Sequence, residues 1–150
     1  MSDDVQDHVI ARIEAAPIQR LPSPHFHVDG VFPADYYDAL LDNFPGDENF
    51  LTLAETGRVP PGSYPERSVF LPDDDAAMAG LAPAKLAFWQ ALRQWFLGER
   101  FLRAMAGKFP NAVSARFGAL AGQAKFYPEA MVVRDRSNYA IGPHTDAPHR

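Results

Sequence analysis

Apolar residues recur every three or four positions in three stretches of the chain, a spacing that places them on one face of a helix. This pattern predicts helices over residues 3–15, 33–44 and 83–108, the last with a break at Gly98. A proline opens the second and the third, where its missing N–H costs nothing. The apolar positions behind the prediction are Val5, Val9, Ile10 and Ile13, then Tyr36, Leu40, Leu41 and Phe44, and then Phe88, Trp89, Leu92, Trp95, Phe96, Phe101, Leu102 and Met105.

The aromatic side chains of residues 83–97 form a wide apolar face. A stripe of this kind is more typical of a core packed against a sheet than of a ligand site, because buried aromatic rings contribute most of their free energy by leaving water. We therefore expect the face to be structural.

Strand signals follow a different pattern, with alternating or β-branched positions bounded by Gly, Pro, Asn and Asp. They predict strands over residues 25–28, 67–71, 125–135 and 139–146, with a turn at 134–138. Residues 109–125 carry no pattern that favours either structure. The irregular stretch 46–75 is long for a connection, so we expect it to form a wall or lid beside a site. Helices first and strands last indicate an α+β domain whose helical layer covers one face of a sheet.

Composition narrows the class of protein without naming a function. The length of 150 residues fits one domain, 1–150, and 47% hydrophobic with 22% charged residues is ordinary for a globular protein. The net charge of −5 argues against nucleic acid or an anionic membrane as the main partner. With no cysteine, the chain has no disulfide and no thiolate metal site. The N-terminus lacks the apolar core of a secretory signal, so a cytoplasmic location is the default expectation.

His144 and Asp146 lie two positions apart near the C-terminus. Residues i and i+2 of a strand share a face, about 7 Å apart along the backbone, so an imidazole and a carboxylate would project side by side and could bind one divalent metal. A surface His and Asp at a strand end is the alternative, because so short a pattern arises by chance. His25 and His27 repeat the spacing, but no carboxylate is expected to be poised as a third ligand on that face, which favours the exposed face of a strand over a metal site.

The surrounding sequence adds a resemblance to a known family. The run VVRDRSNYAIGPHTDAPHR, residues 132–150, resembles the first metal-ligand region of the 2-oxoglutarate/Fe(II)-dependent oxygenases, in particular the prolyl-4-hydroxylase-like branch. Residues 24–45 and 88–101 are also similar to that branch. The resemblance implies that His144 and Asp146 bind Fe(II), that 2-oxoglutarate is the cosubstrate, and that the reaction hydroxylates an unactivated C–H bond.

The resemblance also implies a fold, in which N-terminal helices pack on the start of a double-stranded β-helix, or jelly roll. The family takes a second His and a basic residue that grips 2-oxoglutarate from later strands, and this sequence does not reach those positions. His149 is a poor substitute, because it lies five residues after His144 and an odd separation places it on the opposite face of a strand. We therefore expect the barrel to be incomplete within this chain, the natural protein to extend past Arg150, and the 150-residue chain alone to be inactive. A non-catalytic binding module derived from the same fold is the alternative.

Two further residues are candidates for binding the cosubstrate. A phenol donates one hydrogen bond to a carboxylate and a guanidinium donates two in parallel, so Tyr139 and Arg134 could line its pocket. Alternatively, Arg134 is a solvated turn residue and Tyr139 is half-buried core. The hydroxylated substrate, whether a small molecule or a peptide, is not specified by any motif.

Overall fold

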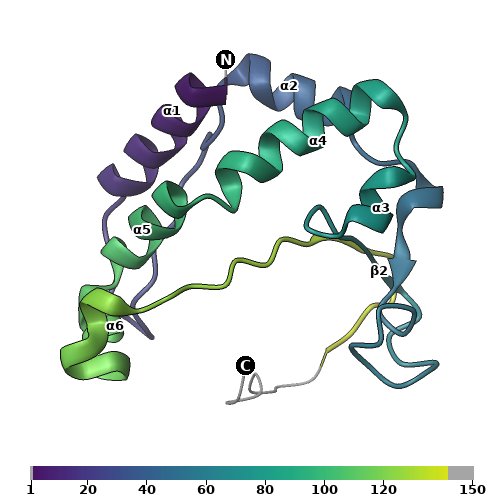
Figure 1. Cartoon of the computed structure of the whole chain (residues 1–150). Coiled ribbons are helices and arrows are strands. Elements are labelled where there is room, and N and C mark those ends of the chain that lie inside the picture. The colour runs from purple at the N-terminus through teal and green to yellow at the C-terminus, as the bar shows by residue number, and fades with distance from the viewer. Residues whose placement is uncertain (1, 142–150) are drawn as a thin grey trace.

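The computed structural model describes residues 2–141, which form a layer of helices against a small antiparallel sheet (Figure 1). This arrangement is an α+β fold, as expected, and the sheet is not closed in the described part of the chain. The helices are α1 (Ser2–Ala15), α2 (Ala34–Asp42), α3 (Asp75–Ala79), α4 (Pro83–Phe96), α5 (Glu99–Lys108) and α6 (Pro110–Phe117), with the short 3-10 helices η1 (Asp47–Asn49) and η2 (Gly118–Gln123), and the strands are β1 (Leu51–Thr52), β2 (Arg67–Phe70) and β3 (Val132–Asp135).

Strand β2 is the centre of the sheet, with β1 and β3 antiparallel on either side. Helices α3 to α6 lie between β2 and β3 in the sequence, so the pairing of these strands is long-range. Because side chains alternate along a strand, the register defines two faces. One face of the sheet, here called the helical face because it is turned toward the helices, carries Thr52, Ser68, Phe70, Val132 and Arg134. The opposite face, here called the outer face, carries Leu51, Arg67, Val69, Val133 and Asp135.

The core lies between the helical face and the helices. Phe70 is fully buried, and its ring meets that of Trp89 edge-on at 5.2 Å between centroids. The indole N–H of Trp89 donates to the carbonyl oxygen of Asn43 at 2.9 Å, so this large side chain is buried with its donor satisfied. The aromatic face of α4 is therefore core, as its pattern predicted.

The three predicted helical stretches are confirmed. Helix α1 lies alongside α4 and α5 and buries its apolar face there (Figure 1). The predicted break falls between α4 and α5 at Gly98. A Cβ at this position would lie 2.9 Å from the backbone oxygen of Gln94, so the chain turns there in a space that only glycine fits.

Two of the predicted strands are wrong: one does not form, and the other is shorter than predicted. Residues 25–28 do not form a strand: only His25 pairs, with Gln19, and the neighbouring Phe26 instead packs its ring 5.9 Å from that of Phe109. The predicted strand 125–135 is formed only over Val132–Asp135, because in the described part of the chain no other strand pairs with the backbone of residues 125–131.

Residues 109–125 and 139–141 also differ from the sequence-based expectation. The unassigned residues 109–125 contain α6 and η2. Residues 139–141 are not in a strand, and the remainder of the predicted strand 139–146 lies outside the described residues. Within the described residues, no helix is both long and apolar enough to cross a bilayer.

Candidate functional site

The end of the sheet at the start of β2 brings several candidate residues together. After β3, the backbone N–H of Arg136 donates to the carbonyl oxygen of Glu66 at 2.9 Å, which extends the pairing by one step. A turn follows, in which the N–H of Tyr139 donates to the carbonyl oxygen of Arg136 at 3.2 Å. Asn138 has a φ of 73°, a conformation that Asn adopts more readily than most residues. The turn therefore returns Tyr139 to the beginning of β2.

Arg67 is the centre of this cluster. Its Nε and Nη2 each lie 2.6 Å from a different carboxylate oxygen of Asp135, which is the two-bond geometry that makes guanidinium–carboxylate pairs strong. The same guanidinium lies over the ring of Tyr139, with its carbon 3.9 Å from the ring centroid. One side chain thus connects β2, β3 and the segment that follows β3.

The ion pair shifts the pKa of each partner in the direction that favours its charged form. Hydrogen bonding from Arg67 lowers the pKa of Asp135 below its usual value, and the hydrogen bond to Asp135 raises the pKa of Arg67. Both groups are therefore ionised at neutral pH. Their charges largely cancel, so Arg67 offers a ligand less positive charge than an unpaired arginine would.

Tyr139 has a buried hydroxyl with no hydrogen-bond partner among the described residues. Its ring centroid lies 6.1 Å from that of Tyr64, whose φ of 52° is unusual for a bulky residue. A buried donor without a partner costs roughly 1–3 kcal/mol, and a left-handed backbone at a non-glycine residue costs a similar amount. Such unfavourable features gather more often at functional sites than elsewhere.

Arg134 lies on the other face of the sheet, so the structure does not bring it together with Tyr139. Its guanidinium pairs with Asp47, lies 4.2 Å from the ring centroid of Phe50, and donates through Nε to the hydroxyl of Ser68 at 3.2 Å. The prediction of a turn beginning at this residue is wrong, since it lies within β3. With these three contacts, Arg134 holds the sheet to η1.

The predicted metal ligands, His144 and Asp146, lie outside the described residues. Within residues 2–141, no group of three or more His, Asp or Glu side chains is arranged to hold a metal ion. The ring of His25 contacts the carbonyl oxygen of Ser23 at 2.7 Å. The ring of His27 lies 3.7 Å from the carboxylate of Asp29, so the expectation that no carboxylate is poised near this pair of histidines is wrong for His27. The side chains of His27 and Asp29 are both largely exposed.

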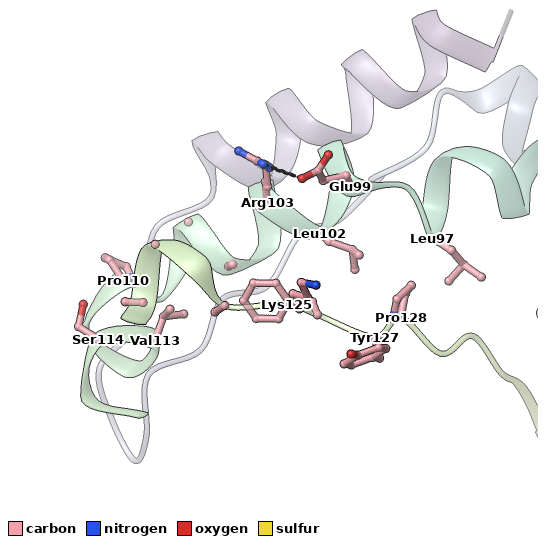
Figure 2. Close-up of a pocket in the computed structure, with 16 residues that line it drawn as sticks. Leu97, Glu99, Leu102, Arg103, Pro110, Val113, Ser114, Lys125, Tyr127 and Pro128 are labelled. Atoms are coloured by element: carbon pink, nitrogen blue, oxygen red, sulfur yellow. Dashed lines mark hydrogen bonds and ion pairs between the residues drawn. The ribbon is translucent and has the colours of Figure 1, made fainter. Parts of the chain in front are cut away.

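A separate cavity of about 650 Å³ lies between α5, α6 and the residues that follow η2 (Figure 2). Its walls combine apolar residues such as Leu102 and Val113 with the ammonium group of Lys125, and the ion pair of Arg103 with Glu99 lies at its edge. The sequence pattern gave no sign of this cavity, because residues 109–125 have no apolar period.

Comparison with known proteins adds no relative: no family model, no curated protein and no solved structure matches the chain.

Of the two described residues expected to bind the cosubstrate, Tyr139 and Arg134, one has a group available for an anionic ligand. The Tyr139 hydroxyl can donate a hydrogen bond, as a 2-oxoglutarate carboxylate would require, whereas Arg134 is committed to Asp47 and Phe50. Sequence reasoning missed Asp135, which stands beside Arg134 in the sequence but on the opposite face. Only the register of β2 with β3 pairs it with Arg67, 68 positions away.

Proposed function

We propose that this chain belongs to a 2-oxoglutarate- and Fe(II)-dependent oxygenase that hydroxylates an unactivated C–H bond, and that its sheet is the start of a jelly roll. The observation that carries the proposal is the buried hydroxyl of Tyr139, which has no hydrogen-bond partner among residues 2–141 and lies five positions before His144 in the run that resembles the metal-ligand region. A donor kept dry and unpaired suits a cosubstrate carboxylate, which would supply the missing acceptor.

In this proposal each residue has a distinct part. His144 and Asp146 supply the imidazole and the carboxylate for the metal. Fe(II), with 2-oxoglutarate and O₂, supplies the oxidising chemistry when bound. Tyr139 donates a hydrogen bond to the cosubstrate, and Arg67, held by Asp135, fixes the ring of Tyr139 so that its hydroxyl is already oriented before the cosubstrate arrives.

The substitution Tyr139→Phe tests the role of the hydroxyl, because it removes one oxygen and keeps the ring on Arg67. We expect 2-oxoglutarate to bind about tenfold more weakly, since a hydrogen bond to a charged group is lost. We also expect the ligand-free protein to melt no lower than the parent, because a buried donor without a partner has been removed. Unchanged 2-oxoglutarate affinity in titration calorimetry would contradict this role.

The metal assignment is tested in protein translated from the complete natural reading frame. We expect His144→Ala to abolish 2-oxoglutarate-dependent succinate release, whereas His8→Ala, at an exposed position on α1, retains it. Turnover retained in His144→Ala would end the oxygenase assignment. Sequencing past codon 150 tests the jelly roll: a β-rich continuation with a further His and then a basic residue supports it, and an immediate stop codon counts against it.

A non-catalytic binding module is the second candidate, and the engagement of Arg134 favours it. Arg134, one of the two residues expected at the cosubstrate, is instead engaged by Asp47 of η1, by the ring of Phe50 and by Ser68 of β2. The two candidates differ in one measurement. In a binding module, 2-oxoglutarate should leave the affinity for Fe(II) unchanged. In an oxygenase, 2-oxoglutarate should raise the affinity for Fe(II), because the cosubstrate and the metal share a site and bind cooperatively.

A further inference from the structure

The cavity beside α5 has a physical cause in its small residues. Five of the positions that face it are alanine or glycine, contributed by α5, η2 and the residue after η2: Ala106, Gly107, Ala121, Gly122 and Ala124. A Cβ placed at Gly107 or at Gly122 would meet no atom within 4 Å. Larger side chains at these positions would fill the space, so the cavity follows from the choice of residues. Its volume of about 650 Å³ is in the range of small-molecule sites.

The walls of the cavity combine apolar surface with the positive charge of Lys125, which pairs with no other described residue. Leu97, Leu102, Val113 and Phe126 supply apolar side chains from four different elements or segments. The side chain of Lys125 lies between residues 124–128 and α5, as Figure 2 shows. In the described part of the chain its ammonium forms no hydrogen bond or ion pair. At the edge, Arg103 is neutralised by Glu99 at 2.6 Å.

The charge of this region is opposite to that of the whole chain. Residues 98–128 hold five Lys and Arg against one Asp or Glu, whereas the chain as a whole has 14 against 19. Two of the five are committed elsewhere: Arg100 pairs with Asp7, and Lys108 donates to backbone oxygens at the end of α1. The local excess of positive charge therefore favours a negatively charged ligand. Of the two cations that line the cavity, Arg103 is paired with Glu99, which leaves Lys125 as the candidate partner for the ligand.

We propose that the cavity between α5, α6 and residues 124–128 is a binding site for a small amphipathic carboxylate. The apolar body of the ligand lies against Leu102, Val113 and Phe126, and its carboxylate pairs with the ammonium of Lys125. This site is separate from the Tyr139 cluster and does not depend on the oxygenase proposal.

The test is a titration of the 150-residue chain with decanoate, followed by calorimetry and by NMR of backbone amides. We expect saturable one-to-one binding, with shifted signals confined to α5, α6 and residues 121–128. Lys125→Met keeps the length of the side chain and removes its charge. We expect it to weaken decanoate binding about fivefold and to leave the binding of decan-1-ol unchanged, since the exposed ion pair contributes up to roughly 1 kcal/mol.

Two further variants separate binding from folding. Arg20→Met removes one exposed positive charge far from the cavity in the sequence and should leave decanoate affinity unchanged. Val113→Trp fills the cavity and should abolish the binding of decanoate and decan-1-ol, while circular dichroism reports the same melting transition as in the parent.

Three outcomes would overturn the proposal. They are binding that fails to saturate, a Lys125→Met variant that loses no preference for decanoate over decan-1-ol, and a concentration-dependent dimer that Lys125→Met leaves intact and Val113→Trp dissociates. The last result would assign the cavity to a second copy of the chain.

Discussion

The aromatic core and the α5–α6 cavity are built from neighbouring parts of the same helical layer, yet they are packed in opposite ways. In the core, Phe70, Trp89 and Trp95 are almost fully buried and their rings contact one another or further rings. Around the cavity, Phe126 is 42% exposed and Tyr127 is 89% exposed. The size of the facing residues contributes to this difference, because alanine and glycine supply much of the cavity lining and large rings face one another in the core.

The difference also concerns the origin of the facing segments. The core is closed by β2, whose pairing with β3 is fixed by backbone hydrogen bonds. The far wall of the cavity is residues 124–128, which belong to no strand and cross below α4 and α5 between α6 and the sheet (Figure 1). A segment with few backbone partners has a low free energy of local opening. The cavity wall should therefore open at a lower free energy than the core.

The largest expected effect comes from opening a hole in the core. Phe70→Ala removes a ring that is fully buried between Phe50 and Trp89, and should lower the free energy of unfolding by about 3–5 kcal/mol. The matched change in the other region, Phe126→Ala, should cost about 1 kcal/mol or less because that ring is already part-exposed. Urea unfolding followed by circular dichroism measures both. Equal losses would show that the two regions are equally well packed.

A pair of glycines gives an intermediate effect with opposite signs. Gly98→Ala should destabilise by about 1–3 kcal/mol, because the new Cβ would lie 2.9 Å from the backbone oxygen of Gln94. Gly107→Ala should stabilise by about 0.5–1 kcal/mol, because the position is inside α5 and the new Cβ meets nothing within 4 Å. Thermal unfolding of the two variants compares them directly. A loss of stability in Gly107→Ala would mean that the cavity is filled in solution.

The smallest effect concerns the ion pair of Arg67 with Asp135. Because the folded state lowers the pKa of Asp135, the pair stabilises the fold above the ordinary pKa of Asp, about 3.9, and this contribution disappears as the pH falls through the folded value. Asp135→Asn should therefore be less stable than the parent at neutral pH and equal to it in strong acid. Urea unfolding across this range measures the convergence.

Asp38→Asn, an exposed position on α2, is the control for a change of charge alone. It should show no such convergence. A difference between Asp135→Asn and the parent that stays constant with pH would mean that the carboxylate acts through something other than its charge.

The helices could be predicted because their signal is local. In α1 and α4, apolar side chains recur with the period of the helix, and the same positions form the core. Helix α6 escaped prediction because residues 109–125 are rich in small residues with no apolar period, and such residues leave a helix undetermined until it packs.

The strands and the site depend on contacts that a sequence does not display. Residues 125–131 carry β-prone side chains, but a strand exists only where a partner supplies hydrogen bonds. The cluster at Arg67 requires Asp135, which only the register of β2 with β3 brings opposite. Tyr139 could be named from the sequence as a hydrogen-bond donor, whereas the burial of its hydroxyl away from any partner in residues 2–141 is a property of the fold.

Both tryptophans of the chain, Trp89 and Trp95, lie in α4 and are buried in the same aromatic core. Indole fluorescence of this protein therefore reports on that helix and its immediate neighbours. A blue-shifted emission spectrum would indicate that the helical layer around α4 is packed, and it would give no information about the Tyr139 turn or the cavity wall. Three of the five tyrosines, Tyr64, Tyr127 and Tyr139, lie outside the helices and contribute a signal from the other parts of the molecule. Emission excited in tryptophan alone, compared with emission excited in both chromophores, would thus help to distinguish the melting of the two regions in a single sample.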